Sequence, residues 1–157
     1  MEESASILLD DLPKEGKEKE RVTRVRVNQY FFRLAVLAAY NFSCCITGLS
    51  VPDLLVAGHI VPWAQDKKNR LNPRNGLCLN ALHDKAFDKG FITISSDHKI
   101  ILSKRIKSIL RNDATMLFFK KFENNKILMP NRFLPDSKFI DFHRQHIFQG
   151  YRIPSFN

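Results

Sequence analysis

Four residues of this chain have the types and the spacing that phosphodiester hydrolysis requires. His59 ends an apolar segment, and Asn75 follows sixteen residues later, on the far side of a polar loop. Asp84 and Asp88 lie four positions apart, so a helix over this segment places both carboxylates on one face. A neutral histidine takes a proton from water, an asparagine braces a loop, and two carboxylates bind a cation. The set therefore predicts a metal-dependent nuclease site.

The two carboxylates decide which cation to expect. Like charges at this spacing repel by a few tenths of a kcal/mol on an exposed helix. We therefore expect a bound cation to offset the repulsion between the two carboxylates, unless Lys85 or Lys89 neutralises them. Oxygen ligands favour a hard ion, with Mg²⁺ or Mn²⁺ ahead of Zn²⁺. His83 is a reserve ligand if the helix begins late. The alternative, judged from the pair alone, is that Asp84 caps the helix and Asp88 faces solvent.

The residues around these four are predicted to contact phosphate groups. The six cations are Lys67, Lys68, Arg70, Arg74, Lys85 and Lys89. Such contacts position a protein on nucleic acid without reading its sequence. The alternatives are a solvated polar loop for the cations, a loop-anchoring side chain for His59 and an ordinary turn residue for Asn75.

Length and charge set the class of protein. With 157 residues, 44% of them hydrophobic, the chain is sized for one compact domain. Lys and Arg number 25 against 16 Asp and Glu, and the resulting net charge of +9 favours a polyanionic partner such as nucleic acid. No apolar run reaches the length of a membrane span, and the acidic start Met1–Ser4 is unlike an export signal, so we expect a cytoplasmic protein without a membrane partner.

The three cysteines agree with a reducing compartment. Cys44 and Cys45 are adjacent, Cys78 is isolated, and no CxxC knuckle occurs, so neither a disulfide framework nor a zinc ribbon is expected. We predict that they are small buried hydrophobic residues. His143 and His146, three positions apart, are interpreted as the surface of a helix rather than as a metal site.

The hydrophobic pattern predicts one domain over residues 23–157, preceded by a flexible charged tail over residues 1–22. We expect a helix from Thr23 to Tyr40, a short strand and turn over Cys44–Thr47, and a strand over Leu54–His59. A polar loop over Ala64–Arg74 follows. The elements predicted after it are, in order, a returning strand, a helix stopped by Gly90, a β-hairpin and two further helices, over Gly76–Asn80, Leu82–Lys89, Phe91–Ser103, Met116–Phe122 and Ser137–Phe148 respectively.

This order of residues resembles the HNH nuclease family. That family has a ββα-metal core, with a general-base histidine at the end of the first strand, an asparagine bracing the loop before the second strand, and metal ligands on the helix. The resemblance implies these roles for His59, for Asn75, and for Asp84 and Asp88. Further segments resemble the branch of predicted restriction endonucleases, namely Arg26–Gln29 with Phe32 and Arg33, Cys45–Gly48, Ala57–Trp63, Arg70–Pro73, Asn75–Leu77, Phe87 with Asp88, and His143 with Arg144 and Phe148.

The resemblance implies an α+β fold and an endonuclease acting on DNA, which we expect to be double-stranded, in restriction or anti-phage defence. One position departs from the family, because many HNH sites have a metal ligand directly before the histidine and this chain has Gly58. Two alternatives therefore stay open, a catalytically inactive nucleic-acid-binding module and a purely structural metal or interaction domain. The oligomeric state is also open, with a homodimer among the alternatives.

Overall fold

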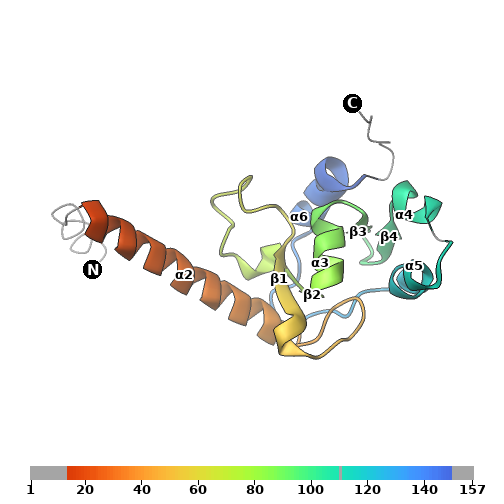
Figure 1. The fold of residues 1–157 in the computed structure, drawn as a ribbon, viewed down its shortest axis with the longest axis horizontal. Coiled ribbons are helices and arrows are strands. Elements are labelled where there is room, and N and C mark those ends of the chain that lie inside the picture. The colour runs from red at the N-terminus through yellow and green to blue at the C-terminus, as the bar shows by residue number, and fades with distance from the viewer. Residues whose placement is uncertain (1–13, 110, 150–157) are drawn as a thin grey trace.

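The computed structural model describes residues 14–109 and 111–149, which form a mixed α+β fold (Figure 1). In Figure 1 a small unit of strands and a helix lies at the centre, further strands lie beside it, and a long helix projects from the body. In chain order the first elements are the long helix α2 (Lys14–Ala39), the 3-10 turn η1 (Pro52–Leu54), β1 (Leu55–His59), the 3-10 turn η2 (Pro73–Asn75), β2 (Gly76–Asn80) and α3 (Ala81–Asp88), and the central unit is β1, β2 and α3. The expected α+β class is confirmed.

Strands β1 and β2 and helix α3 form the predicted ββα unit. The strands pair antiparallel, with Leu55 opposite Asn80 at one end and His59 opposite Gly76 at the other. Helix α3 begins directly after β2 because the side chain of Asn80 accepts a hydrogen bond of 3.0 Å from the backbone N–H of His83. The capping residue is thus Asn80, and the alternative that Asp84 caps this helix is wrong. Gly90, with φ of +73°, follows the end of the helix as expected.

Helix α2 begins at Lys14, whereas the sequence pattern predicted a helix from Thr23 and a flexible tail before it. Residues 14–22 are therefore helical, and the rest of the predicted tail, residues 1–13, lies outside the described part of the chain. The tail was predicted because this segment has no core to pack against. The alternating Lys and Glu instead permit charge pairs along the helix, such as Glu20 with Arg24 at 3.8 Å.

Only the carboxyl-terminal part of α2 packs against the ββα unit. Phe32, Val36 and Leu37 are buried there, and Arg33 donates a hydrogen bond of 2.6 Å to the carbonyl of Leu55 at the start of β1. The amino-terminal part extends away from the body in Figure 1. The helix thereby fixes one side of β1 while leaving much of its own length exposed.

The segment Cys44–Thr47 is a turn rather than the predicted strand. Its backbone nevertheless contacts the sheet at one point, because the N–H of Cys45 donates a hydrogen bond of 2.8 Å to the carbonyl of Cys78 on β2. One such bond does not extend into a ladder, so the segment remains a turn. The three cysteines are free and buried, as predicted.

The predicted hairpin is present as β3 (Ile92–Ile94) and β4 (Ile100–Leu102), which pair antiparallel. Beyond it, the structure adds α4 (Lys104–Ser108), which the sequence analysis did not predict. The helix expected over Met116–Phe122 is instead α5 (Asp113–Phe118) followed by the 3-10 turn η3 (Lys120–Phe122). No helix of the described residues has both the length and the apolar character needed to cross a membrane.

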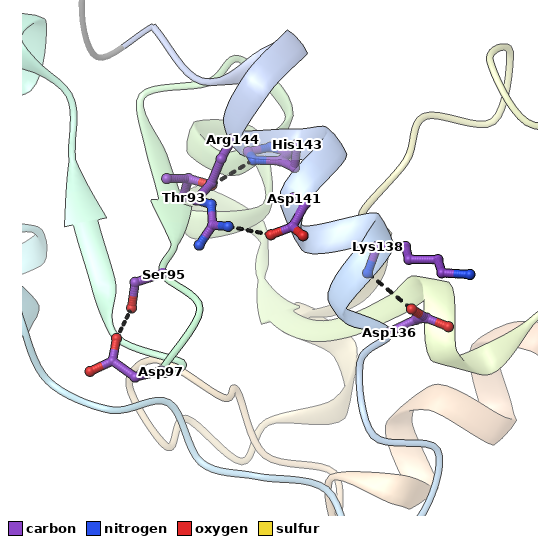
Figure 2. Close-up of polar contacts among 8 residues, drawn as sticks. All are labelled: Thr93, Ser95, Asp97, Asp136, Lys138, Asp141, His143 and Arg144. Atoms are coloured by element: carbon purple, nitrogen blue, oxygen red, sulfur yellow. Dashed lines mark hydrogen bonds and ion pairs between the residues drawn. The ribbon is translucent and has the colours of Figure 1, made fainter.

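The predicted helix over Ser137–Phe148 is α6 (Ser137–Phe142), which continues as the π-helix η4 (His143–Ile147). Asp136 caps α6 through the N–H of Lys138 at 3.0 Å, and Arg144 pairs with Asp141 one turn back (Figure 2). His143 points to Thr93 of β3 in Figure 2 and is 1% exposed, so its interpretation as a surface residue is wrong. The wider π-helical turn brings this ring inward onto the hairpin.

Candidate active site

His59 stands at the end of β1, where three groups fix its ring. The ring stacks on Phe32 of α2 with centroids 4.3 Å apart and planes 9° apart, and it meets Trp63 edge-on at 5.6 Å. Its Nε2 lies 2.8 Å from the carbonyl oxygen of Arg70. A carbonyl only accepts hydrogen bonds, so Nε2 carries the proton and Nδ1 retains the lone pair.

The protonation state of His59 suits a base. Burial lowers the pKa of the imidazole, and the hydrogen bond to the Arg70 carbonyl opposes this shift. The ring is therefore neutral at pH 7, with one nitrogen available to accept a proton. Arg70 lies eleven residues from His59 along an irregular loop, so local sequence signals do not identify this orienting acceptor.

Asn75 closes the loop that runs from His59 to β2. Its side chain is completely buried. Its Oδ1 accepts a hydrogen bond of 2.8 Å from the N–H of Val61, and its Nδ2 donates hydrogen bonds of 3.2 and 3.3 Å to the carbonyls of Val61 and Asn69. Asn69 is next to Arg70, so the same side chain braces the residue that precedes the one whose carbonyl orients His59. This geometry gives Asn75 the loop-bracing position that the resemblance implies.

Asp84 lies in the first turn of α3, with its carboxylate directly against the backbone of β1. A Cβ atom built on Gly58 would fall well within 3.0 Å of Asp84 Oδ1, closer than real Cβ atoms approach other atoms. Burial raises the pKa of Asp84, Asp88 raises it further, and Lys85 opposes the shift. The departure from the family at position 58 thus has a physical consequence, because the missing side chain makes room for the carboxylate of Asp84.

The two aspartates form a small oxygen-donor pair rather than a complete metal cage. Asp88 lies one turn after Asp84 and is exposed, and no ion pair within the described residues neutralises either carboxylate. No group of three or more His, Cys, Asp or Glu side chains in the described residues is arranged to hold a metal ion. Two carboxylates fit Mg²⁺ or Mn²⁺, since such ions keep several waters and use one or two carboxylates.

His83 does not join this pair. Its ring is 2% exposed, its Nδ1 contacts the side chain of Asn80, and its Nε2 lies 2.6 Å from the carbonyl of Phe118. Both ring nitrogens are therefore engaged within the protein. His83 anchors the segment after the hairpin onto α3, and the structure leaves no nitrogen for the role of reserve metal ligand.

The six predicted phosphate-binding cations divide into three groups. Lys67, Lys68 and Arg70 border a groove beside Trp63, and Lys85 and Lys89 are exposed on or just after α3. Arg74 donates a hydrogen bond of 3.1 Å from Nε to the carbonyl of Leu134, so its guanidinium connects a segment that is distant in sequence to η2. Arg70 also has a structural bond, from Nε to the carbonyl of Trp63 at 2.8 Å.

His143 is a second buried histidine, remote from the base in sequence. Its ring stacks on that of Phe87 with centroids 3.7 Å apart. Its Nε2 donates a hydrogen bond of 2.9 Å to the carbonyl of Phe87, and its Nδ1 forms a hydrogen bond of 2.8 Å with the Thr93 hydroxyl. Burial lowers its pKa to about 4, against smaller opposing effects of the Phe87 carbonyl and Asp88. It holds the C-terminal helix against α3 and β3 and takes no part in the candidate site.

Comparisons with known proteins agree with this geometry. The family model described as HNH endonuclease matches residues 44–95, which include both strands, the intervening loop and α3. A solved structure titled modification-dependent TagI restriction endonuclease has a similar fold, with a TM-score of 0.56, 18% identity and 74% of this chain covered. The match spans 37% of the length of that protein. A search of the curated proteins finds no match to this chain.

Proposed function

We propose, on the premise that residues 44–95 match the HNH endonuclease family model, that the protein hydrolyses phosphodiester bonds of double-stranded DNA with His59 as general base and a divalent cation at Asp84 and Asp88. The observation that supports the base most strongly is the 2.8 Å bond between His59 Nε2 and the Arg70 carbonyl. It leaves Nδ1 as the proton acceptor on a ring held by Phe32.

The residues divide the work of the reaction. His59 takes a proton from water through Nδ1, and the resulting hydroxide attacks the scissile phosphorus. The bond from phosphorus to the leaving oxygen breaks, and that oxygen takes a proton from solvent. Asn75 keeps the loop in place, so the ring stays oriented during the reaction. Asp84 and Asp88 would hold Mg²⁺ or Mn²⁺, which stabilises negative charge on the phosphoryl and leaving oxygens when bound. Lys67 and Lys68 border the site and supply positive charge for the DNA backbone.

The biological setting that we propose is restriction or anti-phage defence. It is supported by the similarity in fold to a protein titled modification-dependent restriction endonuclease and by the net charge of +9. The alternative is a module that binds DNA without cleaving it. That alternative is favoured by the incomplete set of metal ligands among the described residues.

Plasmid cleavage with and without Mg²⁺ or Mn²⁺ tests the proposal. We expect wild-type protein to cleave only with metal, and His59→Ala to lose roughly 10² to 10⁴ in rate. Because alanine also removes the stacking on Phe32, His59→Gln is the second variant, which keeps an amide donor for the Arg70 carbonyl. His146→Ala, an exposed histidine on η4, is the matched control and should cleave normally.

A folded His59→Gln protein that cleaves at the wild-type rate would overturn the assignment of the base. Metal-independent cleavage by the wild type would overturn the proposed role of the divalent cation. If the wild type binds duplex DNA tightly and cleaves none with either metal, the non-cleaving module is the correct alternative.

A further inference from the structure

A groove of about 220 Å³ lies between helix α2 and the loop that connects β1 to β2. Val25 and Asn28 of α2 border one side, Lys67, Lys68 and Arg70 border the other, and Trp63 lies beside them. Trp63 is also the residue that meets His59 edge-on at 5.6 Å. The groove therefore opens next to the candidate base, and a duplex seated at His59 would pass over it.

The loop side of this groove is held in place by its own hydrogen bonds. Asp66 accepts from the backbone N–H groups of Lys68 and Asn69, both at 3.1 Å, and from Asn69 Nδ2 at 2.7 Å. Arg70 lies over the ring of Trp63 at 4.8 Å. A loop that is already ordered loses little conformational entropy when it binds phosphate groups.

The helix side carries a cation that the sequence analysis did not assign to the site. Arg21 precedes Val25 by four residues and Asn28 by seven, so the three share one face of α2. Arg21 is exposed. Arg26 is rotated about 100° from Val25 and faces elsewhere on the same helix. Glu18 lies one turn before Arg21 on the same helix and is also exposed.

We propose that α2 is the second wall of the DNA-binding site, with Arg21 and Asn28 binding backbone phosphates opposite Lys67 and Lys68. From residue 21 to residue 28 the helix rises about 10 Å, which matches about three nucleotide steps of one strand at roughly 3.4 Å each. The Arg21 guanidinium donates to phosphate oxygens through its planar fork, and the Asn28 amide donates a neutral hydrogen bond. This inference rests on the proposed function and extends its substrate contacts to a helix outside the ββα unit.

Duplex binding by the full chain, measured by fluorescence anisotropy in EDTA so that no cleavage occurs, tests the inference. We expect Arg21→Ala to raise Kd about five- to tenfold and to lower the slope of log K against log salt by about 0.9. The matched control, Arg26→Ala, removes the same charge from the same helix and should change Kd by less than about twofold. Arg21→Lys should recover most of the binding, because it restores the charge.

Both alanine variants should remain folded, because alanine has the highest helix propensity and both positions are exposed. Circular dichroism and thermal unfolding check this directly. Equal effects of Arg21→Ala and Arg26→Ala would overturn the inference, since only net charge would then matter. An unchanged Kd in Arg21→Ala would also overturn it.

The two proposals fail in distinguishable ways. If the wild type cleaves DNA with metal but Arg21→Ala binds normally, the nuclease stands and the second wall is wrong. If Arg21→Ala weakens binding but no variant or condition gives cleavage, the second wall stands and the catalytic proposal is wrong.

Discussion

The carboxylate of Asp84 occupies the space beside Gly58 that a side chain on β1 would otherwise fill. Strand β1 and helix α3 are therefore in direct contact at the candidate metal site. Gly58, directly before the candidate base, has no side chain, and Asp84 of α3 places its carboxylate at this position instead.

This relationship predicts the effect of Gly58→Ala. The added methyl would displace Asp84, so we expect a higher metal concentration for half-maximal cleavage and a loss of about 1 to 3 kcal/mol in unfolding free energy. Metal titrations and urea unfolding measure both. Adding Gly58→Ala to an Asp84→Ala protein should cost little stability, because the clash is already relieved. Equal costs in the two backgrounds would contradict the proposed steric contact.

Asp84→Asn and Asp88→Asn should each raise the Mg²⁺ or Mn²⁺ concentration needed for activity. The metal-free protein should keep its stability or gain a few tenths of a kcal/mol, because a like-charge repulsion is removed. Since the pKa of Asp84 is raised by burial and by Asp88, the wild type should need less metal as the pH rises through that pKa. His83→Ala is the control, and it should lower stability without changing metal dependence. The opposite pattern would assign the metal to His83.

Asn75→Ala should destabilise the protein by about 1 to 3 kcal/mol, because the buried N–H of Val61 loses its acceptor. The carbonyl of Asn69 would also lose its donor, which loosens the loop beside the Arg70 carbonyl that orients His59, so we expect kcat to fall more than KM changes. Amide exchange at Val61 and steady-state cleavage are the measurements. A variant with slow exchange at Val61 and normal kcat would show that Asn75 does not brace the loop.

Lys67→Ala with Lys68→Ala should weaken binding to every duplex by a similar factor and reduce the salt slope by about 0.9 per lost phosphate contact. Arg70 is left intact because its Nε bonds to Trp63 and its carbonyl orients His59. The double variant Lys121→Ala with Lys126→Ala removes the same charge from exposed positions near η3 and serves as the control. Loss of affinity for only one sequence would show that the loop reads bases.

The buried His143 predicts a loss of stability in acid. Its pKa is about 4 when folded and near 6.5 when unfolded, so below pH 6.5 the unfolded chain binds more protons. Unfolding free energy should therefore fall as the pH drops from 6.5 to 4, by about 3 kcal/mol in total. Urea unfolding across this range should show a smaller fall in His143→Gln. Parallel curves for the two proteins would mean that His143 is not the responsible group.

The sequence by itself determined the ββα unit and the order of its chemical groups. The apolar segment ending at His59, the stop at Gly90 and the i, i+4 spacing of Asp84 and Asp88 are local signals, because each depends on residues within one or two turns of backbone. The start of α2 was misjudged for the converse reason. Its first residues have no core to pack against and no hydrophobic periodicity, so only charge pairs such as Glu20 with Arg24 indicate a helix there.

Only the tertiary structure decided which of the candidate groups are available for chemistry. The roles of His83 and His143 depend on the carbonyls of Phe118 and Phe87, each more than thirty residues away in the chain. The acceptor for His59 lies on an irregular loop, and the position of Val25 and Asn28 beside that loop depends on how α2 packs through Phe32. Such contacts join segments that are distant in sequence, so no local pattern of residue types specifies them.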